Sequence, residues 1–168
     1  MPLAAGHIKE PLPQLAPLAG LRVERTFDAA LMGQLQGRRV DEMLERFGYG
    51  HRAFVAWHDG APAAFGWAAM TGASIGELGI QFEVTEGDAY LWNFVTLPAF
   101  RGLGIYPRLL DAIVTALGAE AERFWIAYAP ENHASGAGVA KAGFTAVAEL
   151  SFDDTGRAAV RGLTAEGG

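Results

Sequence analysis

Residues 101–106 read Arg-Gly-Leu-Gly-Ile-Tyr and form the segment of the chain best suited to hold an anion. Gly102 and Gly104 have no Cβ, so a ligand can approach the backbone closely. Arg101 adds a fixed positive charge, and its guanidinium can bind a phosphate through two hydrogen bonds. A helix that starts here would add unpaired N–H groups and the positive end of its dipole. The chemistry that we expect is therefore phosphate binding.

The segments on either side have the patterns of a strand and a helix. Residues 90–97 are apolar and aromatic, which predicts a mostly buried strand, and Pro98 ends it because proline donates no hydrogen bond to a sheet. Residues 105–117 carry apolar side chains at helical spacing, with Pro107 in the first turn, where its missing N–H does no harm. The sequence therefore predicts a strand, a glycine turn and a helix.

The residues present exclude two common nucleotide loops. The fingerprint Gly-x-Gly-x-x-Gly needs glycine at Pro107, and no loop ends in Gly-Lys-Ser/Thr. The segment instead resembles the acetyl-CoA pyrophosphate loop of the GCN5-related N-acetyltransferases, the GNAT superfamily, which reads Arg/Gln-x-x-Gly-x-Gly/Ala after a proline-containing turn. Arg101, Gly104 and Pro98 match this pattern, whereas Tyr106 replaces the last small residue. An ordinary glycine-rich connection between a strand and a helix is the alternative.

A second segment, residues 132–144, resembles another GNAT pattern, in which Asn-x-x-Ala/Ser is followed by seven residues and Gly-Phe. Asn132, Ser135 and the pair 143–144 match at this spacing. The segment follows the first loop by one expected strand, residues 123–128, which is the order found in the superfamily. Two partial motifs in the right order are more specific than either alone, and the resemblance extends roughly over residues 20–163.

The resemblance implies an α/β (α+β) fold, with a GNAT-like mixed, mostly antiparallel sheet of about six to seven strands and helices on both faces. Asp59-Gly60 predicts a tight hairpin, and residues 80–84 alternate like a strand. The expected helix 40–48 carries an apolar stripe that we interpret as core packing, made by Val40, Met43, Leu44 and Phe47. Charged residues beside this helix are interpreted as solvated surface, namely Arg38, Arg39 and His51.

Composition limits the possible classes of protein. The 168 residues, 51% of them hydrophobic, fit one domain over residues 21–168 with an irregular arm over residues 1–20. A net charge of −6 argues against binding of nucleic acid or an anionic membrane, and no apolar run is long enough to span a bilayer. We read no signal peptide. The absence of cysteine excludes disulfides and suits a cytoplasmic protein, and the four histidines lack metal-ligand spacing.

The resemblance also implies which residues hold acetyl-CoA. Backbone groups of Phe94, Val95 and Thr96 would bind the pantetheine arm. Asn132 would reach the arm from the other side, and Ser135 would contact the phosphate end. The backbone N–H groups of the loop would hold the pyrophosphate, namely those of Arg101, Gly102, Leu103, Gly104, Ile105 and Tyr106.

The catalytic residues are less clearly marked. The superfamily often has a tyrosine seven residues after the asparagine, which protonates the leaving thiolate, but this chain has Val139 there. Substitutes with a hydroxyl are Tyr128, which we place first, Tyr106 and Ser135. A general base would take a proton from the amine through water, with Glu83 as the first candidate and Glu86 and Asp88 as others. Asn93, a polar residue in an apolar strand, is either a bulge residue or a contact to substrate or water.

We therefore expect an acetyl-CoA-dependent N-acetyltransferase that works by direct attack of an amine on the thioester, with catalytic residues Tyr128, Glu83 and Asn93. The alternative is a non-catalytic GNAT-like module that binds CoA as a sensor or interaction domain, as the missing tyrosine suggests. A plain α/β domain without a CoA site is a third reading. The acceptor would be a small-molecule or peptide amine, and the final hairpin permits a homodimer.

Overall fold

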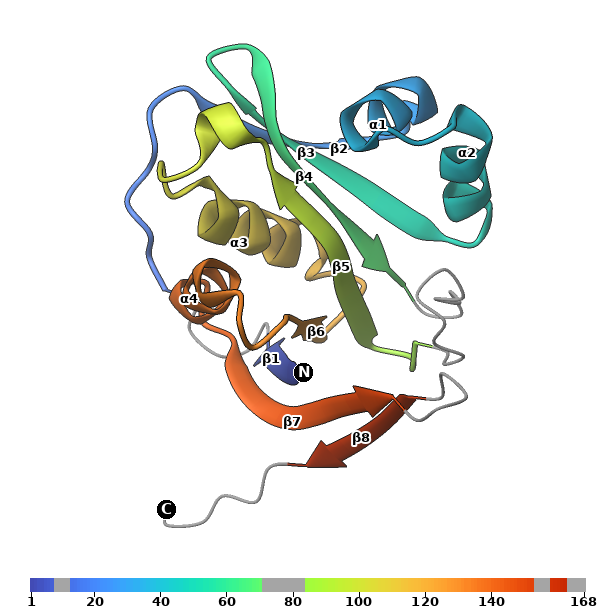
Figure 1. The fold of residues 1–168 in the computed structure, drawn as a ribbon, viewed down its shortest axis with the longest axis vertical. Coiled ribbons are helices and arrows are strands. Elements are labelled where there is room, and N and C mark those ends of the chain that lie inside the picture. The colour runs from blue at the N-terminus through green and yellow to red at the C-terminus, as the bar shows by residue number, and fades with distance from the viewer. Residues whose placement is uncertain (8–12, 71–83, 153–157, 163–168) are drawn as a thin grey trace.

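The computed structural model describes residues 1–7, 13–70, 84–152 and 158–162, and they build one mixed sheet with helices on both sides (Figure 1). Within these residues the sheet has eight strands in the order β2-β3-β4-β5-β6-β1-β7-β8, and only the β5–β6 pair is parallel. The strands are β1 (Pro2–His7), β2 (Leu21–Thr26), β3 (His51–His58), β4 (Ala61–Ala69), β5 (Asp88–Thr96), β6 (Arg123–Ala127), β7 (Thr145–Phe152) and β8 (Ala158–Gly162). The helices are α1 (Ala29–Gln36), α2 (Val40–Gly48), the short η2 (Pro98–Phe100), α3 (Ile105–Leu117) and α4 (His133–Lys141).

Helices cover both faces of the sheet, which confirms the expected architecture. Leu109 and Ile113 of α3 and Val139 of α4 are buried in one core cluster. Met32 of α1 and Met43 of α2 are buried in a second cluster on the other face. Among the described residues, no helix is long and apolar enough to cross a membrane.

β1 adds a strand to the expected count of six to seven, and it lies between β6 and β7. Leu3 is opposite both Ala127 of β6 and Ala148 of β7, and its side chain is buried. The expectation of an irregular arm is therefore wrong for residues 2–7. A segment rich in proline and alanine has weak strand propensity, but hydrogen bonds along both of its edges override that preference.

The expected apolar stripe of α2 is only partly correct. Met43 is buried, but Val40 and Leu44 are 46% and 57% exposed, and Arg46 is buried in their place. The helix is turned so that the guanidinium of Arg46 lies over the ring of Trp67, at 4.8 Å from its centroid. An arginine can take an interior position when aromatic faces receive its charge and its aliphatic stem packs.

The tight hairpin between β3 and β4 is confirmed. Asp59 and Gly60 both have positive φ, at 50° and 83°, as a two-residue turn of this kind requires. The expected strand over residues 80–84 lies outside the described residues, except for Val84, which is buried.

Candidate functional site

A cleft opens where β5 and β6 separate. Parallel pairing joins Asp88–Leu91 to Arg123–Ile126, whereas β5 continues to Thr96. Backbone groups in the second half of β5 therefore face the cleft on this side instead of a neighbouring strand. The cleft has a volume of about 860 Å³, and its walls are β5, the start of α3, the end of β6 and α4.

The glycine loop forms one end of this cleft. Gly102 and Gly104 have φ of 80° and 78°, a conformation that glycine adopts without strain. Gly104 immediately precedes α3 and offers no side-chain cap, so the first N–H groups of the helix are left for a ligand. A Cβ on Gly102 would meet no atom within 4 Å, which means that the loop has open space beside it.

Two arginines flank the loop and add positive charge to the start of α3. Arg101 is exposed and donates its Nε to the carbonyl oxygen of Thr96 at 3.2 Å. Arg108 donates to the carbonyl oxygens of Gly104, at 2.7 Å, and Ala16, at 2.8 Å. Arg108 therefore ties the loop to the segment that precedes β2.

Tyr106, the residue that departs from the motif, packs against a glycine of α4. A Cβ on Gly138 would lie 2.4 Å from Cδ1 of Tyr106, so the tyrosine ring occupies space that any other residue at 138 would need. The ring also packs on Phe94 at 5.7 Å between centroids. The Tyr106 hydroxyl lies 3.5 Å from Oγ of Ser135, and burial raises the pKa of this hydroxyl, partly offset by that hydrogen bond. A large residue at 106 and a missing side chain at 138 thus compensate each other.

α4 begins at a side-chain cap, but its valine does not reach the cleft. The Oδ1 atom of Asn132 accepts a hydrogen bond from the backbone N–H of Ser135 at 3.0 Å, which caps the helix. Val139 is only 2% exposed and belongs to the core. Tyr128 lines the cleft, and its ring packs against Gly136, where a Cβ would be 3.1 Å from Cε2.

Asn93 sits in a β-bulge between β4 and β5. The pairing jumps from Phe65–Val95 to Trp67–Trp92, so Asn93 is an extra residue on β5, and its φ is +58°. Asparagine is one of the few side chains that adopt this conformation readily. The first of the two alternatives, a bulge residue, is therefore confirmed, and Asn93 also lines the cleft.

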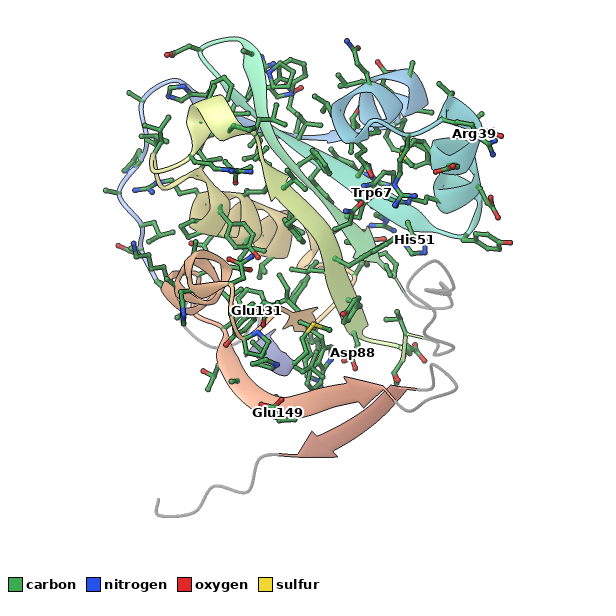
Figure 2. The ribbon with its side chains drawn as sticks, viewed as in Figure 1. Arg39, His51, Trp67, Asp88, Glu131 and Glu149 are labelled. Carbon is green, nitrogen blue, oxygen red and sulfur yellow. The ribbon has the colours of Figure 1, made fainter. Side chains whose placement is uncertain are left out.

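A buried polar group on the α2 face of the sheet, which we name the Arg46 cluster, has no motif in the sequence. Arg46 is 2% exposed and lies 4.5 Å from the ring centroid of Trp92. Its Nη1 donates to Oε1 of Gln36 at 3.0 Å and to Oδ1 of Asn93 at 2.8 Å. Figure 2 labels two residues of this cluster, His51 and Trp67, near α2. The cluster consists of Gln36, Arg46, His51, Trp67, Trp92 and Asn93.

The expectation of solvated surface is wrong for His51 and is confirmed for Arg38 and Arg39. His51 is 4% exposed rather than solvated, and its Nδ1 accepts a hydrogen bond from Nε1 of Trp92 at 3.0 Å. Arg38 and Arg39 are exposed, and each makes an ion pair within its own surface turn. The sequence signal for His51 was its place at the start of β3, where alternate residues face the core.

The candidate bases differ in position. Asp88 begins β5, far from the cleft end of that strand, and accepts hydrogen bonds from Arg123 and Trp125 (Figure 2). Asp88 is absent from the residues that line the cleft, and these bonds join it to β6. Glu86 is exposed in the turn before β5, and Glu83 lies outside the described residues.

The expected cofactor residues converge on the cleft. All of them line it except Leu103, whose side chain is 43% exposed. In the part of the chain that the structure describes, no three acidic or histidine side chains are grouped as metal ligands. The shape of the cleft therefore suits an elongated ligand that lies along β5 and places an anionic group at the start of α3.

Comparisons with known proteins point to the same fold. AAC(6')-Ib in complex with paromomycin and acetyl-CoA matches with a TM-score of 0.62 and 15% identity, over 89% of this chain and 99% of that one. Aminoglycoside N-acetyltransferase AAC(6')-Iy in complex with CoA matches with a TM-score of 0.60 and 18% identity, over 79% and 97%. A search of curated proteins finds no match.

A longer structural neighbour is the GCN5-related N-acetyltransferase from Kribbella flavida, with a TM-score of 0.57 and 17% identity. The match covers 86% of this chain but only 53% of that protein, so the chain spans about half of its length. The model of the Acetyltransferase (GNAT) family matches residues 22–144, which include both segments that the sequence singled out. The chain therefore belongs to the GNAT acetyltransferase family.

Proposed function

We propose that the protein is an acetyl-CoA-dependent N-acetyltransferase that acts on an amine by direct attack on the thioester. The observation that carries this proposal is the cleft between β5 and β6, which ends on the glycine loop at the start of α3. Membership of the GNAT family supports it, as do neighbours whose structures contain CoA or acetyl-CoA.

The residues present fit acetyl-CoA. The backbone of residues 94–96 offers amide groups to an extended pantetheine arm, because β6 does not pair with this part of β5. The N–H groups of residues 101–106 and the open space beside Gly102 suit a pyrophosphate. Asn132 and Ser135 complete the opposite wall. Acetyl-CoA would supply the activated acetyl group.

For the chemical step we propose Tyr128 as the proton donor, Glu83 as the base acting through water, and Asn93 as a polar contact at the bulge. Tyr128 directly follows β6 on the wall of the cleft, which supports its role. Backbone N–H groups at the edge of β5 would polarise the carbonyl that the amine attacks. Neither the proton donor nor the base has a motif of its own.

The acceptor remains a small-molecule or peptide amine, and aminoglycosides enter the test set because two structural neighbours are named for them. We also propose that residues 21–168 form one domain, to whose sheet β1 adds a strand from outside this range. We further propose that the protein is cytoplasmic and can form a homodimer.

Calorimetric titration of acetyl-CoA into wild type and Gly102→Glu tests the proposal. A carboxylate at position 102 would repel a pyrophosphate, so the variant should lose binding. Gly37→Glu is the matched control, because Gly37 also has positive φ and open space for a Cβ but ends α1, away from the cleft. No binding by wild type would refute the proposal.

A CoA-binding module without catalysis is the second candidate, because the position that carries the family's tyrosine holds the buried Val139. An acceptor panel separates the two by release of free CoA thiol, with paromomycin, glucosamine, cyclohexylamine, spermidine and a lysine peptide as acceptors. Turnover of any amine favours the enzyme, whereas binding of acetyl-CoA without turnover favours the module.

A further inference from the structure

Asn93 connects the cleft to the Arg46 cluster. It lines the cleft as part of β5, and its side chain reaches the α2 face of the sheet, where Oδ1 is 2.8 Å from Nη1 of Arg46. The bulge and the φ of +58° are what turn the side chain out of the regular alternation of the strand. Asn93 therefore stands where an acceptor bound on the α2 side would meet a thioester lying in the cleft.

Arg46 determines which way the Asn93 amide points. A guanidinium has only donors, so the atom of Asn93 that faces it must be the oxygen. The Nδ2 group, with its two N–H donors, consequently points away from Arg46. In the described part of the chain, Nδ2 donates to no protein atom. The amide thus presents donors, and an amide has no basic site, so Asn93 is not the base.

Arg46 is itself held in place. Its guanidinium lies 4.8 and 4.5 Å from the ring centroids of Trp67 and Trp92, and Nη1 also donates to Gln36. The side chain is 2% exposed, so the guanidinium has no room to swing into solvent. A hydrogen bond from a cation also polarises the amide and makes its N–H groups better donors.

We propose that Asn93 donates a hydrogen bond from Nδ2 to an oxygen next to the reacting amine of the acceptor, and that Arg46 is the positioning residue that aims it. The inference rests on the proposed function and deepens it. The preferred acceptor is then an amine flanked by a hydroxyl or carbonyl oxygen, rather than a plain alkylamine or polyamine.

Asn93→Asp tests the donor directly. Aspartate keeps an oxygen for Arg46 but has no N–H, so the cluster stays intact and only the donor is lost. For glucosamine, we expect kcat/KM to fall at least about tenfold through a higher amine KM, with the acetyl-CoA KM unchanged. For cyclohexylamine, which has a ring of the same size without oxygens, the fall in kcat/KM should be several-fold smaller than for glucosamine. Asn93→Gly, which suits the positive φ, should behave like the aspartate variant.

Arg46→Met tests the positioning. The chain has two asparagines, Asn93 and Asn132, so selective ¹⁵N labelling gives only two side-chain amide pairs. In wild type the Asn93 pair should have a fixed, shifted position, which Arg46→Met abolishes and Arg46→Lys partly restores, while the Asn132 pair stays in place. The glucosamine KM should rise with the loss of that signal. Arg39→Met, on the exposed arginine that precedes the same helix, is the control.

The outcomes separate the two proposals. If wild type binds acetyl-CoA but acetylates no amine of the panel, the proposed function fails and this inference fails with it. If wild type is active and Asn93→Asp keeps its preference for glucosamine, only the inference is overturned. A fall in kcat with an unchanged glucosamine KM would also overturn it, because Asn93 would then contact the acetyl group and not the acceptor.

Discussion

The cleft and the Arg46 cluster, which share Trp92 and Asn93, use different parts of the polypeptide. The side that would hold acetyl-CoA presents backbone, namely the free edge of β5, the glycine loop and the first N–H groups of α3. The α2 side presents side chains that come from five separate elements and meet in the Arg46 cluster. Backbone recognition tolerates a changed sequence, whereas a side-chain cluster is tuned to one ligand. If the proposed function holds, the backbone side would carry what the family shares, and the Arg46 cluster would carry the acceptor specificity of this chain.

The largest effect should come from charge in the glycine loop. Gly102→Glu should weaken acetyl-CoA binding at least about hundredfold, because the carboxylate meets the pyrophosphate at the positive end of α3. Isothermal calorimetry measures this loss. Gly37→Glu should bind like wild type, and equal weakening in both variants would mean that strain at a positive φ, rather than the loop, controls binding.

Tyr128→Phe should have the next largest effect, on the chemical step. Loss of a proton donor lowers kcat by about a hundredfold, while the Kd of acetyl-CoA should stay the same. Tyr106 lies at the loop expected to hold the pyrophosphate and shares its hydroxyl with Ser135, so Tyr106→Phe should lower kcat much less. Steady-state kinetics with the best amine compares them, and the reverse order would assign the proton donor to Tyr106.

The wall between α3 and α4 can be tested by stability. Gly138→Ala places a methyl 2.4 Å from the ring of Tyr106, which costs about 1–3 kcal/mol of overpacking, against about 1 kcal/mol that alanine gains in a helix. Denaturant unfolding should show net destabilisation. In a Tyr106→Ala background the same change should become stabilising, and a cost that persists there would disprove the pairing of these two positions.

The smallest effect concerns Asp111 on α3, a charged side chain on the side built mainly from backbone. Burial raises the pKa of its carboxyl from 3.8 to about 6, and Oδ1 is buried without a hydrogen bond from any residue that the structure describes. The folded state therefore disfavours the ionised form, and this cost is absent below pH 4 and complete above pH 6. Asp111→Asn should raise the free energy of unfolding at pH 8 by about 1 kcal/mol, allowing for solvent screening, and not at pH 4. Thermal melts at both pH values would show it.

The donor side was predictable because its determinants are local. Proline, glycines and a helical stripe within residues 98–117 specify the loop, and Asn132 marks the start of α4 shortly after β6. Each feature depends on neighbours in the chain, so spacing alone reveals it. The same holds for the turn at Asp59-Gly60.

The acceptor side was not predictable because its contacts are distant in sequence. Arg46 looks like a surface arginine on a helix until Trp67 and Trp92, from two different strands, are placed around it. The bulge at Asn93 arises from the pairing of β4 with β5, where the ring of Phe94 covers Gly66. Polar residues found in apolar strands are the one hint that sequence provides, and Asn93 was singled out for that reason.

The place of β1 in the sheet has a consequence for the order of folding. β1 precedes the other strands in the sequence, yet Leu3 pairs with Ala127 and Ala148, far along the chain, so this pairing must wait until those later strands exist. β2 to β5 can pair with strands adjacent in sequence, and they form the early half. Closing so long a loop carries a large entropic cost, so we expect β1 to dock late and slowly. The cleft lies between β5 of this half and β6, the neighbour of β1, so we expect its walls to become rigid only after β1 has docked.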